Sequence, residues 1–162
     1  MTRGRAALVA TAGIVLAAAL ATLAGARFGW FAGSRPADLG LRGGAFAPGD
    51  GRPNWVSSTV APADPHYVAP LEAGDHPVPA WVRLQRAIEA TPRARIVKLE
   101  PGYLHAEFAS ERLGFVDDAQ FALDPSGRRI HVKSGARLGI RDFGVNRARI
   151  EALRAAVAGA PR

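Results

Sequence analysis

The chain of 162 residues contains no cysteine, one methionine and only 7% aromatic residues. The absence of cysteine excludes disulfides, thiolate nucleophiles and thiolate metal sites. The sequence also lacks the glycine-rich and histidine-rich patterns of phosphate-binding loops, dinucleotide-binding folds and zinc proteases. The 48% of apolar and 22% of charged residues are sufficient for one modest domain with a packed core and an appended segment.

The formal net charge of +7 is located at the C-terminal end of the chain. Residues 1–127 carry equal numbers of basic and acidic side chains, whereas residues 128–162 carry nine Lys or Arg against Asp142 and Glu151. A high net positive charge is typical of proteins that bind nucleic acid. Because the excess is confined to one segment, any functional account of the charge has to concern that segment.

Residues 1–31 are predicted to be a transmembrane anchor or a signal segment. Between Arg5 and Arg27 lie 21 residues without a charge, and a helix of that length spans about 30 Å, the hydrocarbon thickness of a bilayer. A small-residue pattern allows signal cleavage after Ala26. The aromatic residues Phe28 and Trp30 instead favour an uncleaved anchor with an interfacial belt.

The flanking charges predict the orientation of this segment. Arg3 and Arg5 precede the apolar run, and the positive-inside tendency keeps such residues in the cytoplasm. We therefore expect an inner-membrane anchor with the domain outside the cytoplasm, or a protein secreted to the periplasm after signal cleavage. Either location argues against nucleic acid as a partner.

Residues 32–79 contain most of the 12 prolines and show no helical periodicity. This composition predicts an extended segment with one short strand-like run at residues 54–60. Apolar residues such as Trp55, Tyr67 and Leu71 distinguish it from a flexible linker. We call residues 32–79 the strap, because we expect it to pack across the domain and belong to it in part.

Residues 80–162 are predicted to form an α+β core. Trp81, Leu84 and Ile88 form a helical stripe, which the Pro at position 92 ends. Strand-like runs follow at residues 94–100, 103–109, 115–123 and 129–134, with tight-turn residues within the first and the second pair. We expect a four-stranded antiparallel meander with one packed face and one solvated face.

A C-terminal helix completes the predicted core. Ile150, Leu153 and Val157 share one face of it, and Asn146 is a suitable N-cap. The element order is an N-terminal hydrophobic helix, the extended strap, a helix, the meander and the final helix. Both core helices are expected on one face of the sheet.

Four short motifs occur in a fixed order along the strap and the core. They are Pro-Asn-Trp-Val-Ser-Ser at 53–58, Gly-Phe-Val-Asp-Asp at 114–118, Ser-Gly-Ala-Arg-Leu-Gly at 134–139 and Asp-Phe-Gly-Val-Asn-Arg at 142–147. With these motifs the chain resembles the domain of unknown function 1499 family of bacteria and plants over about residues 38–160. The resemblance implies no established activity.

Arg137, Arg141, Asn146 and Arg147 are the candidate ligand-binding residues. They lie between the last strand and the last helix, where free backbone N–H groups and guanidinium forks favour a carboxylate or phosphate. In the alternative interpretation, Asp142 pairs with an Arg and Asn146 caps the helix, so that the cluster only stabilises the fold.

Asp117, Asp118, His105 and His131 are candidates for acid–base chemistry or for structural roles. Adjacent residues of a strand point to opposite faces, so the two carboxylates are not expected to converge. His105 and His131 are expected on the polar face of the sheet, but a third metal ligand is missing. The sequence therefore predicts no metal site and no cofactor.

These observations favour a membrane-anchored, non-enzymatic module outside the cytoplasm. It would bind an anionic lipid or an acidic protein through its basic C-terminal segment. One alternative is a small hydrolase or lyase that uses Asp117 or Asp118 with a His or an Arg. Another is a structural envelope factor without a ligand.

Overall fold

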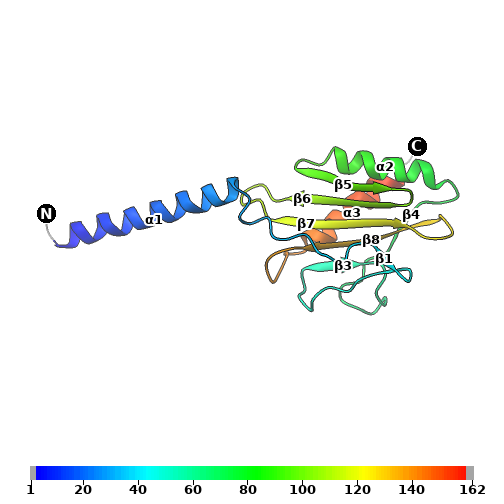
Figure 1. Cartoon of the computed structure of the whole chain (residues 1–162), viewed down its shortest axis with the longest axis horizontal. Coiled ribbons are helices and arrows are strands. Elements are labelled where there is room, and N and C mark those ends of the chain that lie inside the picture. Colours follow the sequence, from blue (N-terminus) through cyan, green and yellow to red (C-terminus); the bar gives the residue numbers. More distant parts are fainter. Residues whose placement is uncertain (1–2, 160–162) are drawn as a thin grey trace.

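The uncharged N-terminal segment forms helix α1, Arg3–Arg27, which projects away from the rest of the molecule (Figure 1). The structure is a computed structural model, and it describes residues 3–159. The stretch Ala10–Arg27 is long and apolar enough to cross a membrane and is almost entirely exposed. A signal sequence near the N-terminus can meet the same criterion of length and hydropathy, so α1 is consistent with either a signal anchor or a signal peptide.

The predicted meander is confirmed, with each strand hydrogen-bonded antiparallel to the next. Its strands are β5 (Ala94–Glu100), β6 (Tyr103–Ala109), β7 (Val116–Leu123) and β8 (Arg129–Ala136). Gly102 and Gly127 have φ values of +73° and +72°, which only glycine adopts without steric cost, and this explains the two tight turns. The fold is α+β, as the sequence predicts.

The strap contributes strands to the same sheet. β3 (Trp55–Ser57) and β4 (Leu71–Glu72) pair antiparallel with successive parts of β8, so the strand order is β3-β8-β7-β6-β5 with β4 beside β3 along β8. A small separate hairpin is formed by β1 (Leu41–Arg42) and β2 (Ala45–Phe46). β8 is therefore an interior strand, which the predicted four-stranded meander would have left at an edge.

Both core helices pack on one face of the sheet, as predicted (Figure 1). They are α2 (Pro77–Glu89) and α3 (Val145–Ala158). α2 buries Leu84 and Ile88, and α3 buries Ile150 and Leu153. The predicted N-cap at Asn146 is wrong: Gly144 with φ of +80° is the N-cap, and Asn146 lies one residue inside α3. A glycine is favoured there because other residues adopt a positive φ only with strain.

The opposite face of the sheet is covered over β6 and β7, which corrects the prediction of a wet face there, whereas Arg95 and Lys98 of β5 remain exposed. His105 and Gln120 on this face are 2% and 4% exposed. The first half of the strap crosses it: the Gly40 N–H donates to Gln120 Oε1 at 2.6 Å, and Lys133 Nζ donates to the carbonyl of Ala47 at 2.6 Å. Alternation along a strand identifies residues that share a face, but it does not reveal what covers that face.

Candidate functional site

The predicted ligand-binding residues do not converge on one pocket. Arg137 extends beneath the strap, where its side chain is only 7% exposed. Asn146 is buried between α3 and the sheet. Arg141 and Arg147 are exposed. Arg137 and Arg141 lie in the loop that follows β8, and Asn146 and Arg147 lie in the first turn of α3, so their side chains reach different surfaces.

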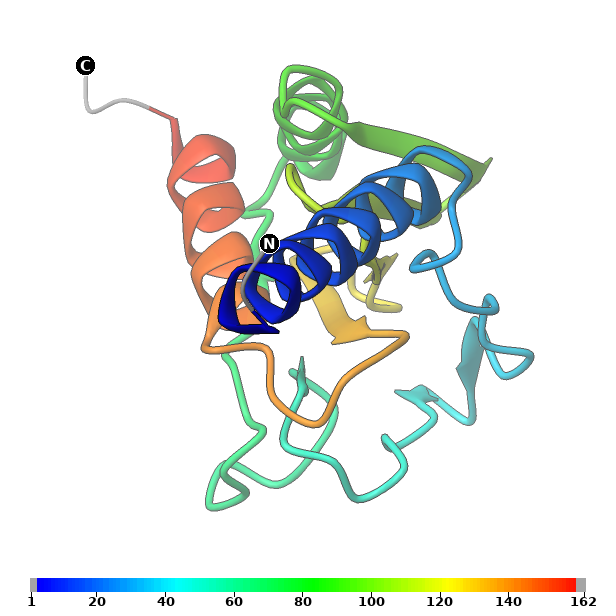
Figure 2. The same cartoon turned by 90° about the vertical axis from the view of Figure 1, so that its left-hand side faces the viewer.

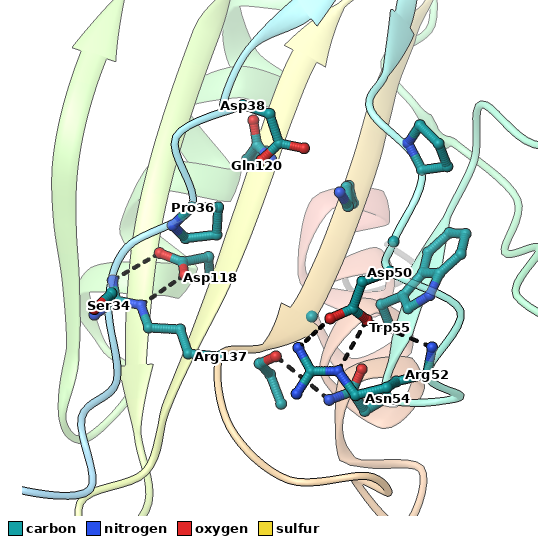
Figure 3. Close-up of a pocket in the computed structure, with 15 residues that line it drawn as sticks. Ser34, Pro36, Asp38, Asp50, Arg52, Asn54, Trp55, Asp118, Gln120 and Arg137 are labelled. Carbon is teal, nitrogen blue, oxygen red and sulfur yellow. Dashed lines mark hydrogen bonds and ion pairs between the residues drawn. The ribbon is translucent and has the colours of Figure 1, made fainter.

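A buried charge cluster lies beneath the strap. Arg137 donates from Nη2 to Glu107 Oε1 at 2.5 Å and from Nε to Asp118 Oδ2 at 2.7 Å. Arg35 of the strap and Arg95 of β5 also donate to Glu107. Glu107 and Asp118 are directly opposite each other on β6 and β7, so the guanidinium of Arg137 neutralises a like-charge cross-strand pair. Figure 3 shows Arg137 beside Asp118.

The cluster holds its acids ionised. Burial acts to raise the pKa of Glu107, but hydrogen bonds from Arg95, Arg35 and Arg137 outweigh it and lower the pKa to about 2. At Asp118 burial likewise acts to raise the pKa, while hydrogen bonds from Arg137 and His105 lower it below its usual range. His105 Nε2 lies 2.7 Å from Asp118 Oδ1. An ionised and fully hydrogen-bonded carboxylate is a poor proton acceptor near neutral pH.

A cavity of about 350 Å³ lies between the strap and this face of the sheet. Asp118 and Arg137 line it on one side, and Asp50, Arg52 and Trp55 line it on the other (Figure 3). Asp50 and Arg52 form an ion pair. The charged groups of the wall are therefore largely paired with one another.

Lys133 and Trp55 form the part of the cavity wall near the β1–β2 hairpin. Burial lowers the pKa of Lys133 below its ordinary value. Trp55 Nε1 is buried and has no hydrogen-bond partner within the described residues. A Cβ added to Gly49 would lie within 2.1 Å of that nitrogen, so the strap backbone packs directly on the edge of the indole.

The two adjacent acids separate as strand geometry predicts. Asp118 points toward the strap, whereas Asp117 points toward α3 and accepts a hydrogen bond from Arg149 Nη2 at 2.6 Å. The guanidinium of Arg149 also lies over the ring of Phe108, 4.5 Å from its centroid. The two carboxylates are therefore on opposite faces of the sheet and do not form an acid–base pair.

The N-terminus of α3 is occupied by the protein's own carboxylate. Asp142 accepts the backbone N–H groups of Gly144 at 3.1 Å and of Asn146 at 2.9 Å. Burial acts to raise the pKa of Asp142, but these backbone hydrogen bonds lower it overall. Ser134 donates to Asn146 Oδ1 at 2.6 Å, and Asn146 Nδ2 donates to the carbonyl of Asn54 at 3.2 Å. These contacts stabilise the start of the helix and connect it to the strap.

Arg141 and Arg147 are the two candidates whose charges face solvent. Arg147 Nη2 donates to the carbonyl of Pro65 at 3.0 Å, which leaves its charge unneutralised. Arg141 makes no hydrogen bond or ion pair with any residue of 3–159. Both lie within or just after the loop that joins β8 to α3.

The remaining histidine candidate lies apart from the cluster. His131 Nδ1 is 3.2 Å from the hydroxyl of Ser58, on the part of β8 that pairs with the strap. His105 instead contacts Asp118. Across the part of the chain that the structure describes, no three His, Asp or Glu side chains are close enough to hold a metal ion.

Sequence reasoning missed Arg35, Glu107 and Arg149 as parts of these networks. Glu107 had a usable signal, because strand alternation places it on the same face as His105, and the antiparallel pairing of β6 with β7 in the meander sets it opposite an acid of the next strand. Two opposed acids imply a cation between them. Arg35 had no comparable signal, since it reaches Glu107 from 72 positions away.

The fold and these contacts define an α+β domain that follows an apolar N-terminal helix and carries a strap-covered charge cluster. The family described as Protein of unknown function (DUF1499) matches the chain over residues 46–157, which is more than half of it. The chain belongs to this family, and the resemblance seen in its four motifs is confirmed. No curated protein and no solved structure matches it. Arg35 and α1 lie outside the matched range.

Proposed function

We propose that this protein is a membrane-anchored, non-enzymatic module outside the cytoplasm that binds an anionic lipid surface through its basic C-terminal segment. The observation that carries the proposal is that Arg141, in the β8–α3 loop, and Arg147, in the first turn of α3, are both exposed. This loop lies at the end of the sheet from which α1 emerges (Figure 2). The other basic candidate, Arg137, is neutralised by Glu107 and Asp118 and has no part in this role.

Because α1 would anchor the protein in the membrane, a small number of charges would be sufficient for binding to the lipid surface. A basic side chain near an anionic membrane surface contributes about 1 kcal/mol of attraction. Two such residues would be weak in free solution, but α1 would hold them at a high effective concentration near the headgroups. An acidic protein in the same membrane is a second partner of the same charge.

The test uses a soluble version that begins at Ala32, which removes α1 together with Phe28, Trp30 and Phe31. We expect Arg141→Gln with Arg147→Gln to weaken its binding to phosphatidylglycerol vesicles roughly 30-fold, as the loss of about 2 kcal/mol implies. Cosedimentation at low salt measures the binding, and circular dichroism checks the fold.

The matched control removes the same charge elsewhere. Arg42 and Arg86 are exposed on β1 and α2, away from the β8–α3 loop, and Arg42→Gln with Arg86→Gln is expected to leave the binding near that of the parent. Equal loss in both double variants would mean that only the net charge matters. The proposal is rejected if the first pair binds as tightly as the parent.

A hydrolase or lyase is the second candidate function. It is favoured by the contact between His105 and Asp118 and by the position of Asp118 and Arg137 in the cavity wall. The lowered pKa of Asp118 and its saturated oxygens argue against a general base and leave charge stabilisation as its chemical use. This candidate therefore ranks below the membrane-binding one.

A further inference from the structure

The loop between β8 and α3 exposes large apolar side chains. Ile140 is 72% exposed and Phe143 is 94% exposed, while Leu138 and Val145 at the two ends of the loop are 39% and 50% exposed. Soluble monomers rarely expose such residues contiguously unless the patch binds a partner or a membrane. Arg141 lies between them in the sequence.

The backbone of this loop is held in place while its apolar side chains point outward. Asn54 Nδ2 donates to the carbonyl of Gly139 at 2.8 Å, and Arg52 Nη1 donates to the same carbonyl at 3.1 Å. Asp142 accepts the N–H of Gly144. Phe143 has a φ of +52°, a conformation that a bulky residue adopts only with strain. Phe143 therefore combines a strained backbone conformation with a side chain that contacts mainly solvent.

The loop lies at the end of the domain where α1 enters, which Figure 2 views end-on. A Cβ added to Gly33, just after α1, would lie 2.9 Å from Leu138 Cγ. A Cβ added to Gly114 would lie 3.5 Å from the carbonyl oxygen of Ala26, the penultimate residue of α1. The segment that leaves α1 therefore runs against the loop and against the β6–β7 turn.

The same end of the molecule carries a second exposed apolar group. Phe28 and Trp30 follow α1 directly and are 76% and 70% exposed. Phe31 packs against Phe115, with ring centroids 5.6 Å apart, and this contact fixes the exit of α1 against the domain. Aromatic residues at the end of an apolar helix are typical of the membrane interface.

We propose that the β8–α3 loop inserts Ile140 and Phe143 into the interface of the same bilayer that α1 crosses, so that the domain rests on the membrane through this end. Arg141 then places its stem among the lipid chains and its guanidinium at the headgroups. The inference rests on the proposed function in one respect, because it requires α1 to remain in the membrane. It differs in its driving force, because apolar insertion does not depend on anionic lipid.

The cysteine-free chain allows a direct test with single nitroxide labels. Full-length protein with Ile140→Cys is labelled and reconstituted in nanodiscs of zwitterionic lipid and, separately, of mixed anionic lipid. The matched control is Leu99→Cys, which is 52% exposed near the β5–β6 turn at the opposite end of the sheet. We expect oxygen to relax the label at position 140 at least several-fold more than a water-soluble nickel complex does, and the reverse at position 99.

A second variant uses the same label to test whether Phe143 is needed for insertion. Adding Phe143→Asp to Ile140→Cys is expected to return the label to water, with near-UV circular dichroism unchanged. The inference is overturned if the label at position 140 is as accessible to nickel as that at position 99, or if Phe143→Asp leaves its accessibility unchanged. Insertion only in anionic nanodiscs also overturns it and leaves the proposed function standing.

The intact mass of the purified protein shows whether the N-terminal segment has been removed. A chain cleaved after Ala26 in the producing cells would overturn both the inference and the anchored form of the proposed function. Insertion in both lipids together with full vesicle binding by the Arg141 and Arg147 double variant would support the inference alone.

Discussion

Glu107 is the residue on which the charges beneath the strap converge. One carboxylate accepts hydrogen bonds from Arg35, Arg95 and Arg137, which come from the strap, from β5 and from the loop directly after β8. Removing one partner of a buried ionic cluster leaves the others desolvated without compensation. The residue therefore connects three elements that are distant in the sequence.

We predict that Glu107→Gln lowers the free energy of unfolding by about 3 kcal/mol, because it leaves the buried Arg137 with only Asp118. Urea denaturation of the parent and the variant at neutral pH measures the difference. The control is Glu100→Gln, whose carboxylate is half exposed beside Lys98 and should change stability little. A loss of equal size in both variants would contradict the prediction.

The pH dependence of that difference has a defined sign. The folded-state pKa of Glu107 is about 2, below the ordinary value of 4.5, so its contribution is fully present above pH 4.5. The contribution is lost as the pH falls from there through 2, because the unfolded state binds the proton first. The stability difference between the parent and Glu107→Gln should therefore shrink across this window, and denaturation curves between pH 2 and 6 measure it.

At the scale of elements, the sequence predicted the meander and its helices more closely than the strap. The β5–β6 and β7–β8 hairpins are local, so strand alternation and turn residues mark them directly. The strap forms its contacts across most of the chain, as between Gly40 and Gln120. Such long-range pairing leaves no periodic signal. The strand-like run predicted at residues 54–60 contains β3, but its pairing with β8, the cover over the sheet and the contacts of Arg35 could not be predicted.

The sequence identified candidate residues of the site but not their arrangement. Arg137, Asp118 and His105 were named as candidates, but their contacts with one another depend on β6, β7 and β8 being in register. Asn146 was assigned to a cap, whereas the carboxylate of Asp142 accepts the helix N–H groups. A sequence motif identifies residue types, but the packing of the strap over the sheet determines whether a charged side chain is buried or exposed.

At the scale of elements, the prediction concerns the packing of the strap backbone at Gly49 against Trp55. A Cβ at Gly49 would overlap the edge of the Trp55 indole, and moving that indole would disturb its stacking on His66, where the ring centroids are 4.0 Å apart. We predict that Gly49→Ala lowers the free energy of unfolding by about 1–3 kcal/mol through overpacking. Urea denaturation followed by tryptophan fluorescence measures it.

Gly13→Ala is the matched control for Gly49→Ala. A Cβ at Gly13 of α1 meets nothing within 4 Å, so the same substitution should leave the stability of the domain unchanged. An unaltered denaturation midpoint for Gly49→Ala would show that the strap accommodates the extra methyl group without strain.

At the scale of the whole molecule, the retention of α1 decides where the domain works. We predict that the mature protein keeps α1, because the apolar run exceeds the usual length of a signal-peptide core and Phe28 and Trp30 continue it as an aromatic belt. The protein should stay in the membrane pellet after alkaline carbonate extraction. Its intact mass should include the apolar segment.

Cleavage of α1 would be detected by the same measurements. A soluble periplasmic product with Arg27 as its first residue would identify α1 as a cleaved signal. The arginines of the loop would then meet a membrane only by diffusion, and the vesicle affinity of the soluble domain would be the relevant quantity.

The interior position of β8 has a consequence for how the protein matures. β3 and β4 precede β8 in the chain, and both pair with it, so neither finds its sheet partner until the last strand has been made and delivered. Closing such long loops is slow relative to forming local hairpins. The strap would therefore remain an unpaired, partly apolar segment during synthesis. That interval is when proteases and chaperones have their best access to the chain.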